Sequence, residues 1–243
     1  MTQGNQPQWA AERARVVAFY ERQLALYGRQ DARALHWVGA STQFARFEVL
    51  YRVGPWEGHS VADVGSGLGD FCTFLRQRGH TLTALTEGEA DAGEAVRYTG
   101  YDVTPNMVQA ARLNFPQVTF VERDVVAHGV APLHDYTLAS GTFNVRVPNH
   151  DVFFRNAITQ LWAGCTKAVA FNHLGPPTPV GYESPLYYEA DPMELARFCR
   201  SFSPHVVLHT GYLSGDATLF VYKDPAYCPD CAGMRPATPG VHG

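Results

Sequence analysis

The sequence predicts an α/β fold with a seven-stranded, mostly parallel sheet, an antiparallel last strand and helices on both faces. Two observations carry this prediction. Short β-branched or apolar runs alternate with longer segments whose apolar residues recur at helical intervals, as in chains that wind a parallel sheet between two layers of helices. The last two strand-like runs, 205–211 and 217–222, are joined only by "GYLSGDA" and therefore predict an antiparallel hairpin at the sheet edge.

The expected elements follow one another in a regular order. Two amphipathic helices come first: residues 8–28 end at Gly28, and a second helix starts at Ser41 or Thr42 and ends before Gly54. Strands and helices then alternate. The expected strands are 60–65, 97–102, 117–121, 135–141, 166–172, 205–211 and 217–222, and the expected helices are 69–78, 105–114, 151–163 and 192–201.

Two segments are predicted to lie outside these elements. Residues 80–96 are acidic, rich in Gly and Ala and without a stable period, so we expect a loop. Residues 224–243 are rich in Pro and Gly, so we expect a frayed tail. The chain is thereby divided into N-terminal helices at 1–56, a main domain at 57–223 and a tail at 224–243.

The composition of the chain limits the classes of protein to which it can belong. With 243 residues, 46% of them hydrophobic and 17% charged, the chain is expected to form one globular domain with additions. Its formal net charge of -4 disfavours non-specific binding to DNA, RNA or an acidic membrane. The N-terminus lacks the apolar segment of a signal peptide, and no stretch approaches the ~18 apolar residues of a membrane span. We expect a soluble, cytoplasmic protein.

The five cysteines predict no metal site. Cys72, Cys165 and Cys199 lie in apolar-periodic segments, where a reduced and buried thiol is the usual outcome. Cys228 and Cys231 form a CxxC pair, which can hold zinc or cycle between thiol and disulfide. Zinc needs two further ligands, and no second CxxC exists.

The stretch "VADVGSGLGDF" at residues 61–71 is the first candidate binding motif. Gly65, Gly67 and Gly69 follow a strand as GxGxG, whereas a dinucleotide-binding turn uses GxGxxG. Asp70 would repel a pyrophosphate, and no Gly-Lys-Ser or Gly-Lys-Thr follows to make a phosphate-binding loop. Asp63, two residues before the first glycine, suits a ligand that carries positive charge. Alone, the motif is equally compatible with a glycine-rich turn and an incidental carboxylate.

Three later motifs also place polar residues at strand ends. They are "YTGYDVTPNMVQAA" with Asp102, "VTFVERDVV" with Asp124, and "HDYTLASGTFN" with Ser140 and Gly141. Together with the glycine motif, in this order, they resemble class I S-adenosylmethionine-dependent methyltransferases over about residues 60–223. The resemblance implies a Rossmann-like sheet and S-adenosyl-L-methionine as the cofactor.

The resemblance also implies a role for each motif residue. Asp63, Gly65, Ser66, Gly67 and Gly69 would contact the methionine end of the cofactor. Further along the chain, the implied contacts are Asp102 and Val103 at the ribose, Asp124 and the backbone of Val125 at the adenine, and Ser140 and Gly141 beneath the reactive methyl group.

The two N-terminal helices are expected to pack over the cofactor side. Arg46, one turn from Gln43, could pair with the methionine carboxylate or belong to a solvated helix face. One feature departs from the family: Asp63 and Asp102 lie 39 positions apart, more than the family usually shows. We assign the excess to the loop at 82–95. An extra strand within that loop would put the ribose contact of Asp102 in doubt.

Acceptor contacts are expected after the fourth and fifth strands. Methyl transfer is an in-line displacement that depends on alignment, and a general base is optional. His173 is a candidate base or a hydrogen-bonded histidine at a strand end, and Asn144 or Asn172 could orient the acceptor. Residues 174–190, rich in proline and tyrosine, would form either a rim for a partly apolar acceptor or a packed surface loop.

We expect a small-molecule acceptor. "SGTFN" lacks the Asn/Asp-Pro-Pro-aromatic signature of methyltransferases acting on base amino groups, and the net charge is negative. An RNA or protein methyltransferase is the first alternative. A non-catalytic S-adenosylmethionine-binding protein is the second, and a nicotinamide oxidoreductase, disfavoured by Asp70, is the last. The sequence leaves open the attacking atom and the oligomeric state.

Overall fold

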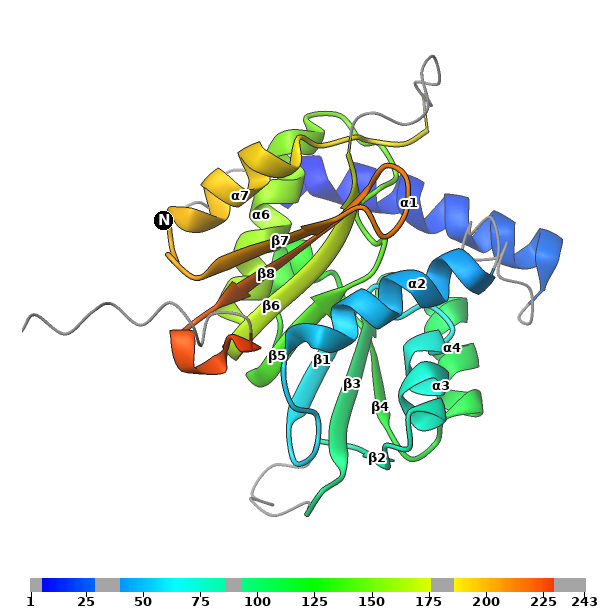
Figure 1. Ribbon diagram of the computed structural model, residues 1–243. Coiled ribbons are helices and arrows are strands. Elements are labelled where there is room, and N and C mark those ends of the chain that lie inside the picture. The colour runs from blue at the N-terminus through cyan, green and yellow to red at the C-terminus, as the bar shows by residue number, and fades with distance from the viewer. Residues whose placement is uncertain (1–5, 29–39, 86–92, 176–185, 230–243) are drawn as a thin grey trace, which may run out of the picture.

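The computed structural model describes residues 6–28, 40–85, 93–175 and 186–229. A central sheet of eight strands is flanked by helices (Figure 1). The strands are β1 Ser60–Val64, β2 Leu82–Thr83, β3 Val96–Asp102, β4 Thr119–Glu122, β5 His134–Ala139, β6 Cys165–Leu174, β7 Val206–Thr210 and β8 Asp216–Tyr222. The helices are α1 Gln6–Tyr27, α2 Ala40–Leu50, α3 Asp70–Gln77, α4 Pro105–Asn114, α5 Val125–His128, α6 His150–Ala163 and α7 Pro192–Arg200, with 3-10 turns η2 Tyr51–Val53 and η3 Pro225–Tyr227.

The strand order confirms the predicted α/β class. The sheet runs β2-β3-β1-β5-β6-β8-β7, and β4 pairs with β3. β1, β3, β4, β5 and β6 are parallel, whereas β8 is antiparallel to both β6 and β7. The hairpin predicted from the last two runs is therefore present, with β8 inserted between β6 and β7.

The predicted loop at 80–96 contains a short strand. Leu82 and Thr83 pair with Val96 and Arg97 of β3, on the edge of β3 that faces away from β1. This strand was missed because two residues carry no readable alternation. It lies beside the start of β3 and does not separate β3 from β1, so Asp102 still ends the strand next to β1.

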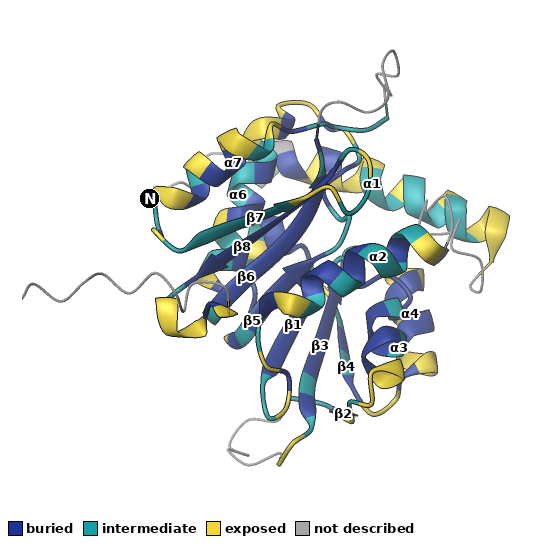
Figure 2. Ribbon diagram, viewed as in Figure 1, coloured by how far each residue is buried: buried dark blue, intermediate teal, exposed yellow. Residues whose placement is uncertain are grey.

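Two hydrophobic clusters cover the two faces of the sheet. The first joins α2, α3 and α4 to one face, through residues such as Phe47 and Phe74. The second joins α5, α6 and α7 to the other face, through residues such as Phe154 and Leu195. All five residues of β1 are buried, as expected for a parallel strand covered on both sides (Figure 2).

Helix α1 lies across the carboxyl end of the sheet (Figure 1). Near its start, the ring of Trp9 contacts the ring of Phe153 in α6, with centroids 5.2 Å apart. Near its end, Tyr20 and Leu24 pack against Leu68 and Met107. α1 thus spans from the α6 side of the molecule to the α4 side, over the strand ends. No helix in the described residues is long and apolar enough to cross a membrane.

Candidate functional site

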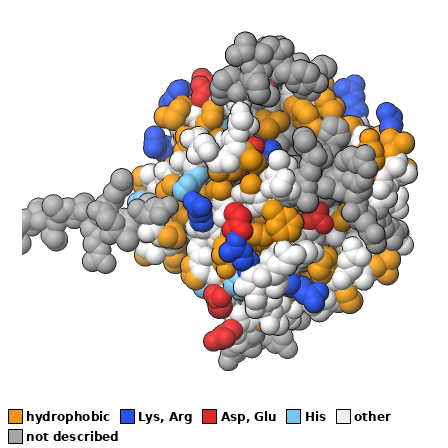
Figure 3. Space-filling view, turned by 45° about the vertical axis from the view of Figure 1, so that its right-hand side comes forward, with side chains coloured by type: hydrophobic (Ala, Val, Ile, Leu, Met, Phe, Trp, Pro, Cys, Tyr) orange, Lys and Arg blue, Asp and Glu red, His pale blue; other side chains and the backbone are white. Residues whose placement is uncertain are grey.

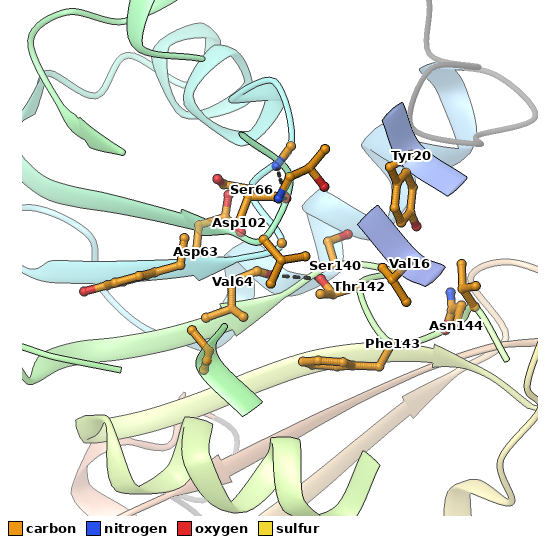
Figure 4. Close-up of a pocket in the computed structure, with 18 of the residues that line it drawn as sticks. Val16, Tyr20, Asp63, Val64, Ser66, Asp102, Ser140, Thr142, Phe143 and Asn144 are labelled. Atoms are coloured by element: carbon orange, nitrogen blue, oxygen red, sulfur yellow. Dashed lines mark hydrogen bonds between the residues drawn. The ribbon is translucent and has the colours of Figure 1, made fainter. Parts of the chain in front are cut away.

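A cavity of about 490 Å³ lies beneath α1, where β1, β3, β4 and β5 end (Figure 4). In open α/β sheets ligands bind beyond the carboxyl ends of the strands, because the loops of several strands meet there. The residues that line the cavity and come from predicted motifs are Asp63, Gly65, Ser66, Gly67, Asp102, Val103, Asp124, Val125, Ser140, Gly141, Asn144 and Arg46. Among the motif residues, Gly69 and His173 are outside this lining.

The glycine loop after β1 needs glycine at all three positions. Gly65, Gly67 and Gly69 have φ of +75°, +53° and +86°, a region that side chains disfavour. A Cβ at Gly65 would collide with Thr142, and one at Gly69 would lie 2.9 Å from the Phe115 ring. Gly69 therefore lies on the side of the loop that packs against Phe115 and not on the cavity side. The backbone at Gly65 and Gly67 forms one wall of the cavity.

Asp63 places a buried carboxyl group in the cavity lining. It is 5% exposed and accepts a hydrogen bond from the Tyr98 hydroxyl. Burial, together with repulsion from Asp102 and Asp70, raises its pKa to about 7, although the Tyr98 bond acts in the opposite direction. Because these three carboxyl groups line one cavity, a ligand with positive charge would be stabilised there.

Asp102 ends β3 and holds the adjacent loops. Its two carboxylate oxygens accept the Gly67 N–H at 2.9 Å and the Thr104 N–H at 2.8 Å. Burial raises its pKa, and these backbone donors oppose the shift. A carboxylate has about four lone-pair sites, so two bonds leave capacity for a ligand diol. The side chain and Val103 both remain in the cavity lining.

Asp124 has a structural role that the sequence analysis missed. It is the N-cap of α5, the one-turn helix that was not predicted, and accepts the Ala127 N–H at 3.1 Å. Val125 is the first residue of this helix, and N–H groups in a first turn have no acceptor within the helix. Both residues line the cavity, so a capped helix start faces the ligand space.

Asn172 fixes the floor of the cavity. Its Oδ1 accepts the Gly141 N–H at 2.6 Å, and its Nδ2 donates to Ser140 Oγ at 3.1 Å. Thr142 Oγ1 donates to the Val64 carbonyl at 2.7 Å (Figure 4). Asn172 does not line the cavity, so we assign it to positioning the 140–141 turn rather than to orienting an acceptor.

Arg46 joins α2 to β8 beside the cavity. Its Nε and Nη2 donate to the two carboxylate oxygens of Asp216, each at 2.8 Å. One turn earlier, Gln43 donates to Asp70 at 2.8 Å. Of the two alternatives left open by the sequence, the solvated helix face is wrong, because Arg46 is only 8% exposed. Its pairing with a methionine carboxylate stays a prediction.

The two predicted acceptor residues are placed differently. Asn144 lines the cavity, and its carbonyl accepts the Tyr188 N–H at 2.8 Å. His173 packs its ring near Phe154, and its Nδ1 lies 2.9 Å from the Leu174 carbonyl oxygen. Burial lowers its pKa and thereby favours the neutral ring. His173 is therefore a hydrogen-bonded histidine at a strand end, and the structure does not bring it to the cavity as a base.

The predicted rim at 174–190 includes residues 176–185, which lie outside the described residues.

His150 holds the loop that carries Asn144. Its Nδ1 accepts the Val147 N–H at 3.1 Å, so the other ring nitrogen donates to the Phe143 carbonyl at 2.8 Å. Burial lowers its pKa to about 4, which keeps the ring neutral as this bonding pattern requires. His150 was not among the predicted site residues, because nothing in the local sequence distinguishes a histidine that bridges two backbone groups.

Helix α1 supplies cavity residues that the sequence analysis also missed. Trp9, Arg13, Val16 and Tyr20 line the cavity and follow one another at helical intervals. In Figure 4, Val16 and Tyr20 point from α1 toward Ser140. The helix was expected over the cofactor side, but its period did not show which of its side chains would line the cavity.

This fold and cavity define a Rossmann-like α/β protein with an acidic ligand site at the ends of its parallel strands. No protein-family model matches the chain. Rv1506c of Mycobacterium tuberculosis H37Rv, a protein classed as a methyltransferase, is 30% identical over 169 residues, which cover 68% of this chain and 93% of that protein. The chain therefore belongs to the methyltransferases, and its fold is that of the class I S-adenosylmethionine-dependent enzymes.

Solved structures share the fold at low sequence identity. Magnesium protoporphyrin IX methyltransferase of Synechocystis PCC 6803, with bound S-adenosylhomocysteine, has a TM-score of 0.58 and 14% identity, covering 87% of this chain and 99% of that one. CalS10 of Micromonospora echinaspora, an amino pentose methyltransferase with bound S-adenosylmethionine, has a TM-score of 0.56 and 12% identity, covering 76% and 91%. In the described part of the chain no cluster of His, Cys, Asp or Glu is placed to hold a metal ion.

The raised pKa of Asp63 predicts a pH-dependent affinity for the cofactor. Asp63 is predicted to contact the ammonium group, and only its ionised form attracts a cation, so S-adenosylhomocysteine binding is expected to strengthen as the pH rises from 6 to 8, by up to roughly tenfold per unit below the pKa of about 7. Asp63→Asn should bind weakly without this slope, whereas Asp151→Asn, exposed on α6, should keep it. Calorimetric titrations at several pH values give the slope, and an equal slope in Asp63→Asn would contradict the assignment.

The same shift makes a prediction for the stability of the cofactor-free protein. A carboxyl whose folded pKa is raised contributes stability that is complete below its ordinary pKa near 4 and is lost as the pH rises through about 7. Asp63→Asn cannot ionise and should lose less stability than the wild type between pH 5 and 8. Thermal unfolding without ligand measures this difference.

Proposed function

We propose that this methyltransferase acts on a small-molecule acceptor by in-line displacement. The observation that carries the proposal is the covered cavity: α1 lies over the strand ends, so the ligand space of about 490 Å³ is roofed by the chain itself. The solved structures with this fold named above act on magnesium protoporphyrin IX and on an amino pentose, both small molecules. A roofed site of this size suits such an acceptor better than a polymer.

Different residues of the cavity have different roles in the proposed reaction. S-adenosyl-L-methionine supplies a methyl group on a sulfonium, whose C–S electron pair returns to sulfur as the acceptor's lone pair forms the new bond to carbon. Asp63 and Asp102 hold the ammonium and the ribose diol, and the Asn172-fixed turn at Ser140 supports the reacting end. α1 excludes water, Asn144 orients the acceptor, and the acceptor's proton passes to solvent.

An RNA or protein acceptor would need a broad charged surface beside the cavity. On the face shown in Figure 3, acidic and basic side chains are interspersed among apolar and polar ones, without an extended basic area in its described part. The described part of this face therefore lacks the extended basic area by which RNA-binding surfaces are recognised.

Binding and transfer are tested separately. Calorimetry should show S-adenosylhomocysteine binding to the wild-type chain, and tritiated S-adenosylmethionine should label a low-molecular-weight fraction of a metabolite extract. Total RNA and bulk protein serve as the competing acceptors. Label in either polymer would contradict the proposal, and binding without any transfer would favour the non-catalytic alternative.

A further inference from the structure

The cavity lining carries several carboxyl groups where its parallel strands end. The strand ends of β1, β3 and β4 carry carboxyl groups, including Asp63, Asp102 and Asp124, and these are the residues we assign to the cofactor. Part of the remaining wall is built by α1, by the loop after β5 and by α6, and the lining side chain of α1 that is charged at neutral pH is Arg13. The acceptor space therefore lies against a differently charged wall.

That wall is aromatic. Trp9 of α1 contacts Phe153 of α6 with ring centroids 5.2 Å apart, and Phe153 contacts Phe143 at 6.0 Å with the rings at 70°. All three side chains line the cavity. Adjacent aromatic rings that face an open space offer edges and faces to a planar apolar ligand.

Arg13 stands one helical turn from Trp9 on the same face of α1. It lines the cavity, is exposed, and has no ion-pair or hydrogen-bond partner in the described part of the chain. The other two lining arginines are engaged: Arg46 pairs with Asp216, and Arg123 donates to the carbonyls of His128 and Gly129. A guanidinium at the rim of an aromatic cavity matches a carboxylate, which it can bind through two parallel hydrogen bonds.

We propose that the acceptor is an aromatic carboxylic acid. Its ring system lies against Trp9, Phe143 and Phe153, its carboxylate pairs with Arg13, and its nucleophilic hydroxyl or amine faces Ser140 on the cavity floor. This inference rests on the proposed transfer to a small molecule. It adds that the acceptor is recognised through α1, the helix that also roofs the cofactor.

The test compares acids with their neutral counterparts on the S-adenosylhomocysteine-loaded protein. Hydroxybenzoic, aminobenzoic and hydroxynaphthoic acids are each titrated beside the corresponding carboxamide, which keeps the ring and the nucleophile and removes the charge. The wild type is expected to bind at least one acid roughly tenfold or more tighter than its carboxamide, as the loss of a charge-assisted pair implies. Arg13→Gln should lose this preference.

Arg22→Gln is the matched control, because Arg22 is exposed on the same helix and does not line the cavity. It should keep the preference, and all three proteins should bind S-adenosylhomocysteine equally. Equal binding of acids and carboxamides, or binding of neither, overturns the proposal. Weaker S-adenosylhomocysteine binding by Arg13→Gln alone also overturns it, since Arg13 would then serve the methionine carboxylate. Loss of S-adenosylhomocysteine binding by the wild type would instead count against the proposed function.

Discussion

Replacing Asp102 with alanine is expected to weaken S-adenosylhomocysteine binding by roughly a hundredfold or more, because hydrogen bonds to a charged group contribute about 1.5–3 kcal/mol each and the ribose offers two hydroxyls. The same change removes the acceptor for the Gly67 and Thr104 N–H groups, so the glycine loop loses its fixed position. Calorimetry with S-adenosylhomocysteine measures the loss. Asp151→Ala, a change on the exposed side of α6, should leave the affinity unchanged.

A second ligand pair separates the ribose contact from the loosening of the loop. Adenosine and 2′,3′-dideoxyadenosine differ in the two hydroxyls, and the wild type should prefer adenosine. Asp102→Ala should bind both equally, whereas a purely structural role would weaken both and preserve their ratio. Asp102→Asn is not a neutral substitution here, because both oxygens accept backbone N–H groups and an amide nitrogen would oppose one of them.

The cofactor end of the cavity was predictable because it depends on strand ends. Parallel strands point their carboxyl ends to one edge, so Asp63, Asp102 and Ser140, each at the end of a strand-like run, had to converge once the alternation of strands and helices was read. The short strand at Leu82 was missed, and it changed little, since it extends an outer edge.

The acceptor end was less predictable because it depends on packing between distant segments. His173 is a histidine beside a strand end, and only the packed structure shows its ring among the residues of the second cluster rather than in the cavity. Trp9 and Arg13 had a readable helical period, and their helix was expected over the cofactor side, but the sequence did not show which of its side chains would face the ligand space. The hydrogen bonds of His150 join the Val147 N–H and the Phe143 carbonyl, which belong to no recognisable sequence motif.

Replacing Asp216 with alanine is expected to cost about 3–5 kcal/mol of stability, because it removes the carboxylate that accepts two hydrogen bonds from the buried Arg46 guanidinium. The Arg46 and Asp216 side chains are only 10% and 3% exposed, and their bond connects α2 to β8 over 170 positions of sequence. Urea unfolding without ligand measures the loss. The double variant Arg46→Leu/Asp216→Leu should recover most of it, since apolar residues that pack well often replace a buried ion pair without net cost. No recovery would mean that the pair does more than offset its own desolvation.

The same variant tests the predicted pairing of Arg46 with the methionine carboxylate. In the wild type this guanidinium donates through Nε and Nη2 to Asp216, so a ligand carboxylate competes with a strong intramolecular partner. In Asp216→Ala the ligand would supply the missing anion. S-adenosylhomocysteine should therefore raise the unfolding midpoint of Asp216→Ala by more than it raises that of the wild type. An equal or smaller increase would place the methionine carboxylate elsewhere and leave Arg46 as the residue that fixes α2 against β8.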